Sequence, residues 1–165
     1  MLLRLLRRNR TDPSPLLSSR LFDDQSFYTS FLHDLRGSRK EVFLESPFIT
    51  KRRMSELSPV LRKLTRQGVR TTINTRDPRE HDHTMRFDAE AAIAELQEMG
   101  VQVLYTDNHH RKLAIIDGWI LWEGSLNIMS QNTSCEIMRR IESPEMAEQM
   151  IEFIKIKKYL TCPGP

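Results

Sequence analysis

The sequence contains little cysteine and no long apolar run. Its two cysteines, Cys135 and Cys162, are too few for a disulfide framework and lack the spacing of a metal site. We therefore expect reduced thiols in a reducing compartment, and hence a cytoplasmic protein. No stretch approaches the roughly 20 apolar residues that a transmembrane helix needs, so we expect no membrane span.

Neither sign of charge is in large excess. The chain carries 25 Lys and Arg against 22 Asp and Glu, a formal net charge of +3. This balance is compatible with a polyanionic partner but does not require one. A length of 165 residues is that of one domain with a single core.

The N-terminal segment lacks the uninterrupted apolar stretch of a secretory signal. Residues 1–10, MLLRLLRRNR, place single and paired leucines between arginines. We favour a plain basic arm, and an organellar transit peptide or a short amphipathic helix at a membrane stays open. Proline and serine in residues 11–20 indicate a linker. We predict an arm and linker over residues 1–20, a folded domain over residues 21–160 and a tail over residues 161–165.

Helical and strand patterns alternate along the first part of this domain. Apolar spacing predicts helices, each closed by a glycine, around residues 27–37, 54–68 and 88–100. Strands are predicted over residues 41–49, 69–75 and 101–106. Pro59 indicates that the second helix restarts within its length. Alternating strands and helices imply parallel crossovers, so we predict an α/β fold with a mixed, largely parallel sheet sandwiched between helices.

Polar residues are concentrated in two further apolar runs. Asp117-Gly118 is a strong signal for a two-residue turn between paired strands. Side-chain alternation then places His110 and Lys112 on one side of the first strand, and Ser125 and Asn127 on one side of the second. Polar groups of this kind cost roughly 1 to 3 kcal/mol each when they are buried without partners. Their concentration therefore indicates a site.

The spacing of these residues resembles the signature of the phospholipase D superfamily. The residues that carry the resemblance are His110-x-Lys112 with Asp117, Gly124-Ser125-x-Asn127, the ESPFIT and QGVRTTINTRD passages, and Glu136. The resemblance covers roughly residues 21–160. By background amino-acid usage, the spacing of His110, Lys112 and Asp117 occurs by chance in roughly one chain in a hundred of this length. Requiring Gly124, Ser125 and Asn127 as well lowers that frequency by on the order of a few thousandfold.

The resemblance implies a phospholipase D-like α/β/α fold and a phosphodiesterase that uses no metal and no cofactor. His110 would attack phosphorus and form a covalent phosphohistidine, which water then hydrolyses. Lys112, Asn127 and Ser125 would stabilise the negative oxygens of the transition state. Glu136 would hold one ring nitrogen of a catalytic histidine and so fix its tautomer.

Asp117 belongs to the same catalytic signature, but the turn alone explains it. Strand alternation would not bring Asp117 beside His110 and Lys112. We therefore expect a structural or indirect role for Asp117.

The other histidines are more simply interpreted as structural or solvated. His109 is expected to face away from His110 on a strand. His81 and His83 flank Asp82 in a charged loop, where three close polar residues are usually solvated. We therefore predict no metal ion.

The chain contains one copy of the motif and no internal repeat, whereas the mechanism needs a second histidine as the acid for the leaving group. Family members with one copy pair as homodimers, so the resemblance implies a homodimer with one composite site on a twofold axis. Ligands bind at the carboxyl edge of open α/β sheets, so basic residues that follow strand ends are candidates for contacts with neighbouring phosphates. These substrate-binding candidates are Lys51, Arg52, Arg53 and Arg76.

We therefore predict an endonuclease that cleaves DNA or RNA. One alternative is a phospholipase or phosphatidyltransferase acting on membrane lipids, which would usually need an apolar entry groove. A second alternative is a non-catalytic nucleic-acid-binding module. The intact His110, Lys112 and Asn127 argue against that second alternative, because binding alone needs no nucleophile.

Overall fold

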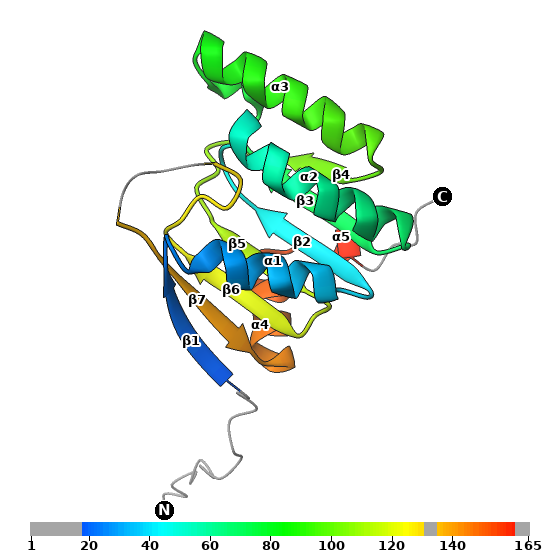
Figure 1. The fold of residues 1–165 in the computed structure, drawn as a ribbon, viewed down its shortest axis with the longest axis vertical. Helices are drawn as coiled ribbons and strands as arrows, with labels where there is room; N and C mark the ends of the chain where they lie inside the picture. The colour runs from blue at the N-terminus through cyan, green and yellow to red at the C-terminus, as the bar shows by residue number, and fades with distance from the viewer. Residues whose placement is uncertain (1–17, 131–134, 161–165) are drawn as a thin grey trace, which may run out of the picture.

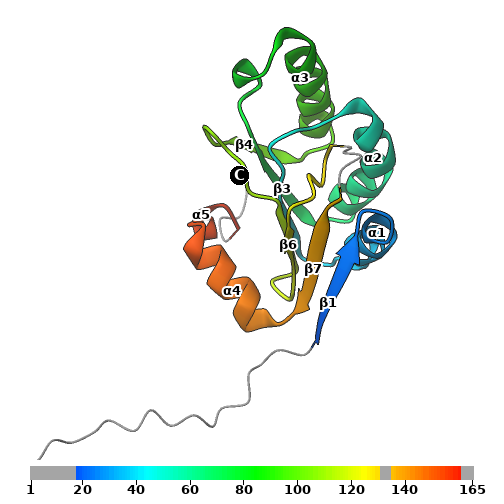
Figure 2. The ribbon, with the colours of Figure 1, turned by 90° about the vertical axis from the view of Figure 1, so that its left-hand side faces the viewer.

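The computed structural model describes residues 18–130 and 135–160, which form a seven-stranded sheet with helices on both faces (Figures 1 and 2). The strands are β1 (Ser18–Asp23), β2 (Glu41–Glu45), β3 (Arg70–Thr75), β4 (Gln102–Tyr105), β5 (Leu113–Ile116), β6 (Ile120–Gly124) and β7 (Ile137–Glu142). The helices are α1 (Phe27–Gly37), α2 (Lys51–Arg66), the 3-10 helix η1 (Pro78–Glu80), α3 (His83–Glu98), α4 (Pro144–Phe153) and α5 (Lys157–Leu160). Within these ranges no helix is long and apolar enough to span a bilayer.

The prediction of a mixed α/β sheet between helices is confirmed, but the sheet is less parallel than predicted. The strand order is β1-β7-β6-β5-β2-β3-β4. β2 pairs with β3, and β3 with β4, in parallel, whereas the remaining described pairs are antiparallel. The predicted crossovers account for the parallel part. The hairpin between β5 and β6 reverses the chain, so the strands that follow it pair in antiparallel fashion.

Side chains of the central strands alternate between two cores. Val42 and Leu44 of β2 belong to the core under α1, α2 and α3, whereas Phe43 belongs to the core under α4 and α5. In β5, Ala114 and Ile116 face the first core, and the residues between and before them face the second. Figure 2 shows the two helical layers on opposite sides of the sheet. Burial on both faces explains why these strands have nearly continuous apolar sequences.

Two helices differ from the sequence prediction. α2 runs without interruption through Pro59, so the predicted restart at that residue is wrong. α3 begins at His83, inside the segment that we read as a polar loop. The Asp82 carboxylate accepts a hydrogen bond from the Met85 amide and so caps the first turn of α3.

The edge strand β1 was not predicted from the sequence. It pairs with β7 from Ser18 opposite Glu142 to Asp23 opposite Ile137, so the sheet begins slightly before the domain start that we predicted at residue 21. The rest of the predicted arm and the predicted tail, with Cys162, lie outside the described residues. No local pattern distinguishes β1 from a linker, because its pairing partner is more than a hundred residues away in sequence.

One edge of the sheet gathers the segments that carry the motif. Glu45, the last residue of β2, is opposite Asn74 near the end of β3 and opposite Leu113 at the start of β5. Leu113 is in turn opposite Glu123 near the end of β6. The loops that leave β2, β3 and β6 therefore meet the segment that enters β5.

Candidate active site

The motif residues lie at this edge, just outside the strands. β5 begins at Leu113 and β6 ends at Gly124, so His110, Lys112, Ser125 and Asn127 flank the strands that we predicted to contain them. The predicted turn between these strands is confirmed, since β5 and β6 form an antiparallel hairpin. The meeting of several loops at one edge, more than strand alternation, brings the polar residues together.

The exposed ring of His110 contacts an arginine. Its Nε2 atom lies 2.7 Å from Nη2 of Arg76, which comes directly after β3. A guanidinium can only donate, so Nε2 is the acceptor, and a neutral ring then carries its proton on Nδ1. The nitrogen that bears the free electron pair therefore faces the Arg76 guanidinium.

Arg76 is itself held in place from several sides. The same Nη2 donates to the carbonyl oxygen of His109 at 3.1 Å, and Nε lies 3.7 Å from a carboxylate oxygen of Glu80. The guanidinium lies over the ring of Phe48, 5.2 Å from its centroid. His81 packs on that ring at 5.3 Å between centroids. The sequence placed Arg76 at a neighbouring phosphate, whereas the structure places it against the predicted nucleophile.

The Lys112 side chain contacts the backbone of His110. Its Nζ donates to the carbonyl oxygen of His110 at 2.6 Å. Burial lowers the pKa of Lys112, the negative charge of Glu136 opposes that change, and the positive charge of Arg76 adds to it. Glu136 and Arg76 are therefore close enough to Lys112 to act on it electrostatically, and His110, Arg76, Lys112 and Glu136 form one polar cluster.

Gly124 and Ser125, at the end of β6, pack against Ile137 at the start of β7. The Ser125 amide donates to the Ile137 carbonyl at 3.0 Å, and the Ser125 hydroxyl accepts from the Ile137 amide at 3.1 Å. A Cβ on Gly124 would lie 2.2 Å from the Ile137 carbonyl oxygen, so only glycine permits this approach. Because Glu136 directly precedes Ile137, this pairing also fixes where Glu136 enters the site.

Asn127 is buried, and its amide oxygen finds no hydrogen-bond partner among residues 18–130 and 135–160. The adjacent main chain is anchored by Tyr28, whose hydroxyl donates to the Ile128 carbonyl at 2.6 Å. Burial raises the pKa of this phenol, which keeps it protonated as a donor. The position of Asn127 therefore depends on α1 as well as on its own loop.

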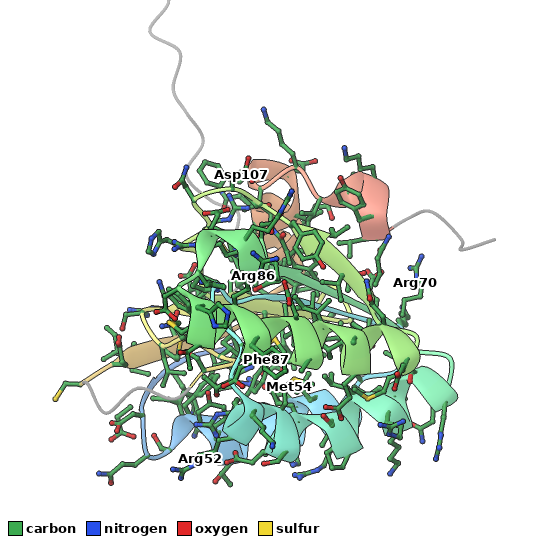
Figure 3. The ribbon with its side chains drawn as sticks, turned by 90° about the horizontal axis from the view of Figure 1, so that it is seen from above. Arg52, Met54, Arg70, Arg86, Phe87 and Asp107 are labelled. Atoms are coloured by element: carbon green, nitrogen blue, oxygen red, sulfur yellow. The ribbon has the colours of Figure 1, made fainter. Side chains whose placement is uncertain are left out.

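The three basic residues that begin α2 do not share one environment. Lys51 and Arg52 are exposed at the start of the helix, and Arg52 is labelled in Figure 3. Arg53 is buried: its guanidinium lies 3.2 Å from the centroid of the Tyr28 ring and pairs with Glu56. Position 53 falls on the core-facing side of the helix, so the predicted phosphate contact of Arg53 is replaced by an internal one.

Asp117 lies at the opposite end of β5 from His110. Its carboxylate accepts hydrogen bonds at 2.8 to 3.0 Å from the Ser38 hydroxyl and the backbone amides of residues 39, 40 and 41. These bonds tie the hairpin turn to the start of β2. In this geometry Asp117 acts on the site only through the placement of strands.

A buried ion pair was missed by the sequence reasoning. Glu45 is fully buried at the end of β2, and its carboxylate accepts hydrogen bonds from Nε and Nη2 of Arg111 at 2.6 and 2.8 Å. Neighbouring His109 is also buried, and burial lowers its pKa. Alternation along the chain predicted only that His109 faces away from His110, and it gave no indication that Arg111 pairs with Glu45.

An apolar groove adjoins the cluster. It has a volume of about 400 Å³, and Lys112 lies on its wall. Large apolar side chains from three elements also line it: Leu21 of β1 and Ile137 of β7, each 60% exposed, and Phe153 of α4, 79% exposed. Exposed apolar side chains gathered around one groove are typical of an interaction surface.

The fold and the edge cluster together define an α/β/α sandwich with a histidine–lysine site. Residues 31–156 match the family model of the cardiolipin synthase, PLD-like domain. The chain therefore belongs to the phospholipase D-like family, and the predicted resemblance is confirmed. Membership supports an enzyme of the phosphodiesterase type. A comparison with curated protein sequences found no match.

Solved structures share the fold. The phospholipase D family member Nuc from Salmonella typhimurium aligns with a TM-score of 0.70 and 17% identity, covering 87% of this chain and 95% of Nuc. NucT from Helicobacter pylori aligns with a TM-score of 0.68 and 16% identity over 87% of this chain and 96% of NucT. Phosphatidylserine synthase from Haemophilus influenzae Rd KW20 aligns with a TM-score of 0.69 and 13% identity over 89% of this chain and 38% of the synthase.

Proposed function

We propose that the chain is a metal-independent endonuclease that cleaves a phosphodiester bond of DNA or RNA through a covalent phosphohistidine. The observation that carries the proposal is the contact of His110 Nε2 with Arg76, beside Lys112. A neutral imidazole with a free electron pair is a nucleophile, and the two adjacent cations can bind the non-bridging oxygens of a phosphate.

The first step transfers the phosphoryl group to His110. When the substrate arrives, a non-bridging oxygen takes over the Arg76 donor, and Nε2 attacks phosphorus. The P–N bond forms as the bond to the ester oxygen breaks. The leaving alkoxide takes a proton from an acid on the opposite side, and Lys112 and the amide of Asn127 stabilise the oxygens meanwhile. Glu136 accepts the Nδ1 proton in a hydrogen bond and so supports the positive charge that develops on the ring.

The second step releases the product. The group that gave up its proton now accepts one from water, whose oxygen attacks phosphorus. The P–N bond breaks, and His110 returns to its neutral form. The acid and base of both steps must be one group facing His110 across the phosphate. We assign this role to His110 of the partner subunit, in a homodimer whose twofold axis passes through the site.

We place the second copy against the apolar groove, because this surface is continuous with Lys112 and therefore with the composite site. Leu21, Ile137 and Phe153 would then be covered by the partner, and the groove would lose its exposed apolar area. The expected assembly is a dimer whose interface and active site are formed together.

Substitution of Phe153 tests this assembly. Phe153→Glu adds a charge at a site that is 79% exposed, so the monomer fold should tolerate it. We expect sedimentation velocity to show a monomer, and we expect this monomer to have no cleavage activity. Phe87→Glu is the matched control, because Phe87 is 71% exposed on α3, on the other face of the sheet (Figures 2 and 3), and should remain an active dimer. A Phe153→Glu protein that stays dimeric, or a wild-type monomer with full activity, would contradict the composite site.

Nucleic acid is the substrate that the charges around the site favour. Lys51 and Arg52 are exposed where α2 leaves the β2 loop, and Arg76 leaves β3 at the same edge. Several phosphate contacts of this kind make affinity fall steeply with salt concentration. We expect the dissociation constant for an oligonucleotide to rise at least tenfold between 50 and 200 mM salt, and a flat response would argue against a track of phosphates.

The decisive assay is cleavage of labelled single- and double-stranded DNA and RNA in excess EDTA. We expect wild type to cleave and His110→Asn to be inactive. His33→Asn makes the same chemical change at an exposed position of α1 and should cleave like wild type. Equal binding without cleavage by wild type and His110→Asn would instead support a binding module.

The groove also favours a second candidate function, a phospholipase or phosphatidyltransferase. An acyl chain could lie along Leu21, Ile137 and Phe153 while its phosphate reaches Lys112. Hydrolysis of phospholipid vesicles, lost in His110→Asn, together with no cleavage of any nucleic acid, would support this function. In that case Phe153→Glu should abolish lipid hydrolysis without any change of oligomeric state.

A further inference from the structure

Glu45 is a carboxylate with no exposure to solvent, paired with the residue that follows the predicted nucleophile in the sequence. Both of its oxygens are used: Oε2 accepts from Nε of Arg111 at 2.6 Å, and Oε1 accepts from Nη2 of Arg111 and from Nδ2 of Asn74, each at 2.8 Å. The Asn74 amide oxygen in turn accepts from the Thr106 hydroxyl at 3.1 Å. A buried charge of this kind is tolerated only with such complete pairing.

Arg111 is the residue between His110 and Lys112. Arg111 lies just before β5, so its pair with Glu45 restrains the backbone from which His110 and Lys112 project. The two parallel hydrogen bonds of a guanidinium on a carboxylate restrain rotation as well as distance. Hydrogen bonding to Glu45 raises the pKa of Arg111, which keeps the pair charged.

The end of β2 also holds the second half of the motif. Ser46, next to Glu45, accepts a hydrogen bond from the Met129 amide through its hydroxyl at 3.1 Å. The Thr50 amide donates to the Met129 carbonyl at 2.8 Å. The loop that carries Asn127 and the segment that carries His110 are therefore both attached to residues 45–50, at and after the end of β2.

We propose that Glu45 and Arg111 form a positioning pair, which sets the orientation and the ring tautomer of His110. This inference rests on the proposed function, because it gives the pair a role in the reaction of His110. Glu45 touches no reacting atom. Its effect passes through Arg111 to the backbone of the residue on each side, and through that backbone to the His110–Arg76 contact.

The alternative is that Arg111 binds a phosphate of the substrate directly, since its side chain is 43% exposed. The two roles predict different kinetics. Loss of a positioning residue lowers kcat with little change in KM, whereas loss of a substrate contact raises KM. A displacement of about 1 Å in the reacting groups is enough to lower the rate by on the order of a hundredfold.

The test compares Arg111→Ala with Arg70→Ala. Arg70, labelled in Figure 3, pairs at 2.8 Å with Glu41, which lies at the opposite end of β2 from Glu45. The Arg70 side chain is 47% exposed, close to the 43% of Arg111. Glu45→Gln and Arg111→Lys are the milder variants, which keep the volume or the charge if the alanine protein fails to fold. Each protein is first checked for folding by its thermal midpoint.

Two readouts are then taken. For cleavage, we expect Arg111→Ala to lower kcat at least tenfold with KM within about twofold of wild type, Arg111→Lys to recover part of that loss, and Arg70→Ala to behave like wild type. In nitrogen-15 NMR spectra of histidine-labelled protein at pH 8, we expect one His110 tautomer in wild type and Arg70→Ala, and a mixture in Arg111→Ala and Glu45→Gln. The His110 signals are assigned by their loss in His110→Asn.

The outcomes separate this proposal from the proposed function. An unchanged His110 tautomer with unchanged kcat in Arg111→Ala overturns the positioning pair, as does a rise in KM alone. If wild type cleaves no nucleic acid, the proposed function fails, and the NMR comparison still decides whether Glu45 and Arg111 set the ring of His110.

Discussion

Replacement of Asp117 by asparagine separates a structural role from a catalytic one. Asp117 belongs to the motif, yet its carboxylate binds the start of β2 at the far end of β5 from His110. Asparagine is the suitable replacement because the backbone at this position has φ of 55°, a left-handed conformation that asparagine adopts readily. Alanine would add backbone strain to the loss of the hydrogen bonds.

The magnitude follows from the hydrogen bonds. Two of the four, from the Ser38 hydroxyl and the Glu41 amide, are partly buried, and two, from the Arg39 and Lys40 amides, are exposed. Charged hydrogen bonds are roughly twice as strong as neutral ones, so loss of the charge weakens all four. The new amide also turns a donor toward the Arg39 amide. We expect a loss of about 2 kcal/mol in the free energy of unfolding, counting mainly the partly buried bonds.

Thermal unfolding and steady-state cleavage measure the two roles. A loss of about 2 kcal/mol corresponds to a fall of about 4 to 8 °C in Tm for a domain of this size. Well below that Tm, kcat should stay within about threefold of wild type, because the site lies at the other end of the strand. An unchanged Tm together with a kcat lowered a hundredfold would refute the structural assignment.

The pH dependence gives a second check. Burial acts to raise the pKa of Asp117, but the hydrogen bonds from three backbone amides and the Ser38 hydroxyl outweigh it, so the pKa lies below its usual range. A carboxyl with a lowered folded-state pKa contributes stability above its unfolded value of about 3.9, and this contribution is lost as pH falls through the folded-state pKa. The Tm difference between wild type and Asp117→Asn should therefore be full at pH 7 and shrink below about pH 4.

Further substitutions test other parts of the site. Arg76→Lys keeps the charge but loses the planar contact with His110, and we expect single-turnover cleavage to slow at least tenfold; an unchanged rate would contradict a role at the reacting phosphate. Gly124→Ala places a Cβ against the Ile137 carbonyl, and calorimetry should show a destabilisation of about 2 kcal/mol or more, so a Tm equal to wild type would be inconsistent with this geometry. Tyr28→Phe removes a half-buried donor to the loop after the motif, and we expect chemical denaturation to show a loss of about 1 kcal/mol together with a lower kcat; wild-type values of both would show that the hydroxyl does not anchor the loop.

The sequence was sufficient for the local elements and for the motif. Apolar periodicity located α1, β2, β3 and β4, because periods of 3.6 and 2 residues report which face of an element is buried. The Asp117-Gly118 pair located the hairpin, because few residues adopt positive φ at two successive positions. Together with the motif spacing, these signals were enough to identify the family, which the match over residues 31–156 confirms.

Partners that are distant along the chain were decided only by the tertiary structure. The sequence of β1 looks like a linker, and only its pairing with β7 makes it a strand. The sequence suggests that Arg53 is a surface cation, whereas the packing of α2 places it against Tyr28. The contact of Arg76 with His110 joins residues 34 positions apart, and the pair of Glu45 with Arg111 joins residues 66 positions apart. Periodicity specifies the face on which a side chain lies but not what meets that face, since the meeting depends on sheet order and on the loops at its edge. The sequence by itself therefore determined the kind of chemistry, and the fold decided which groups surround the histidine that would perform it.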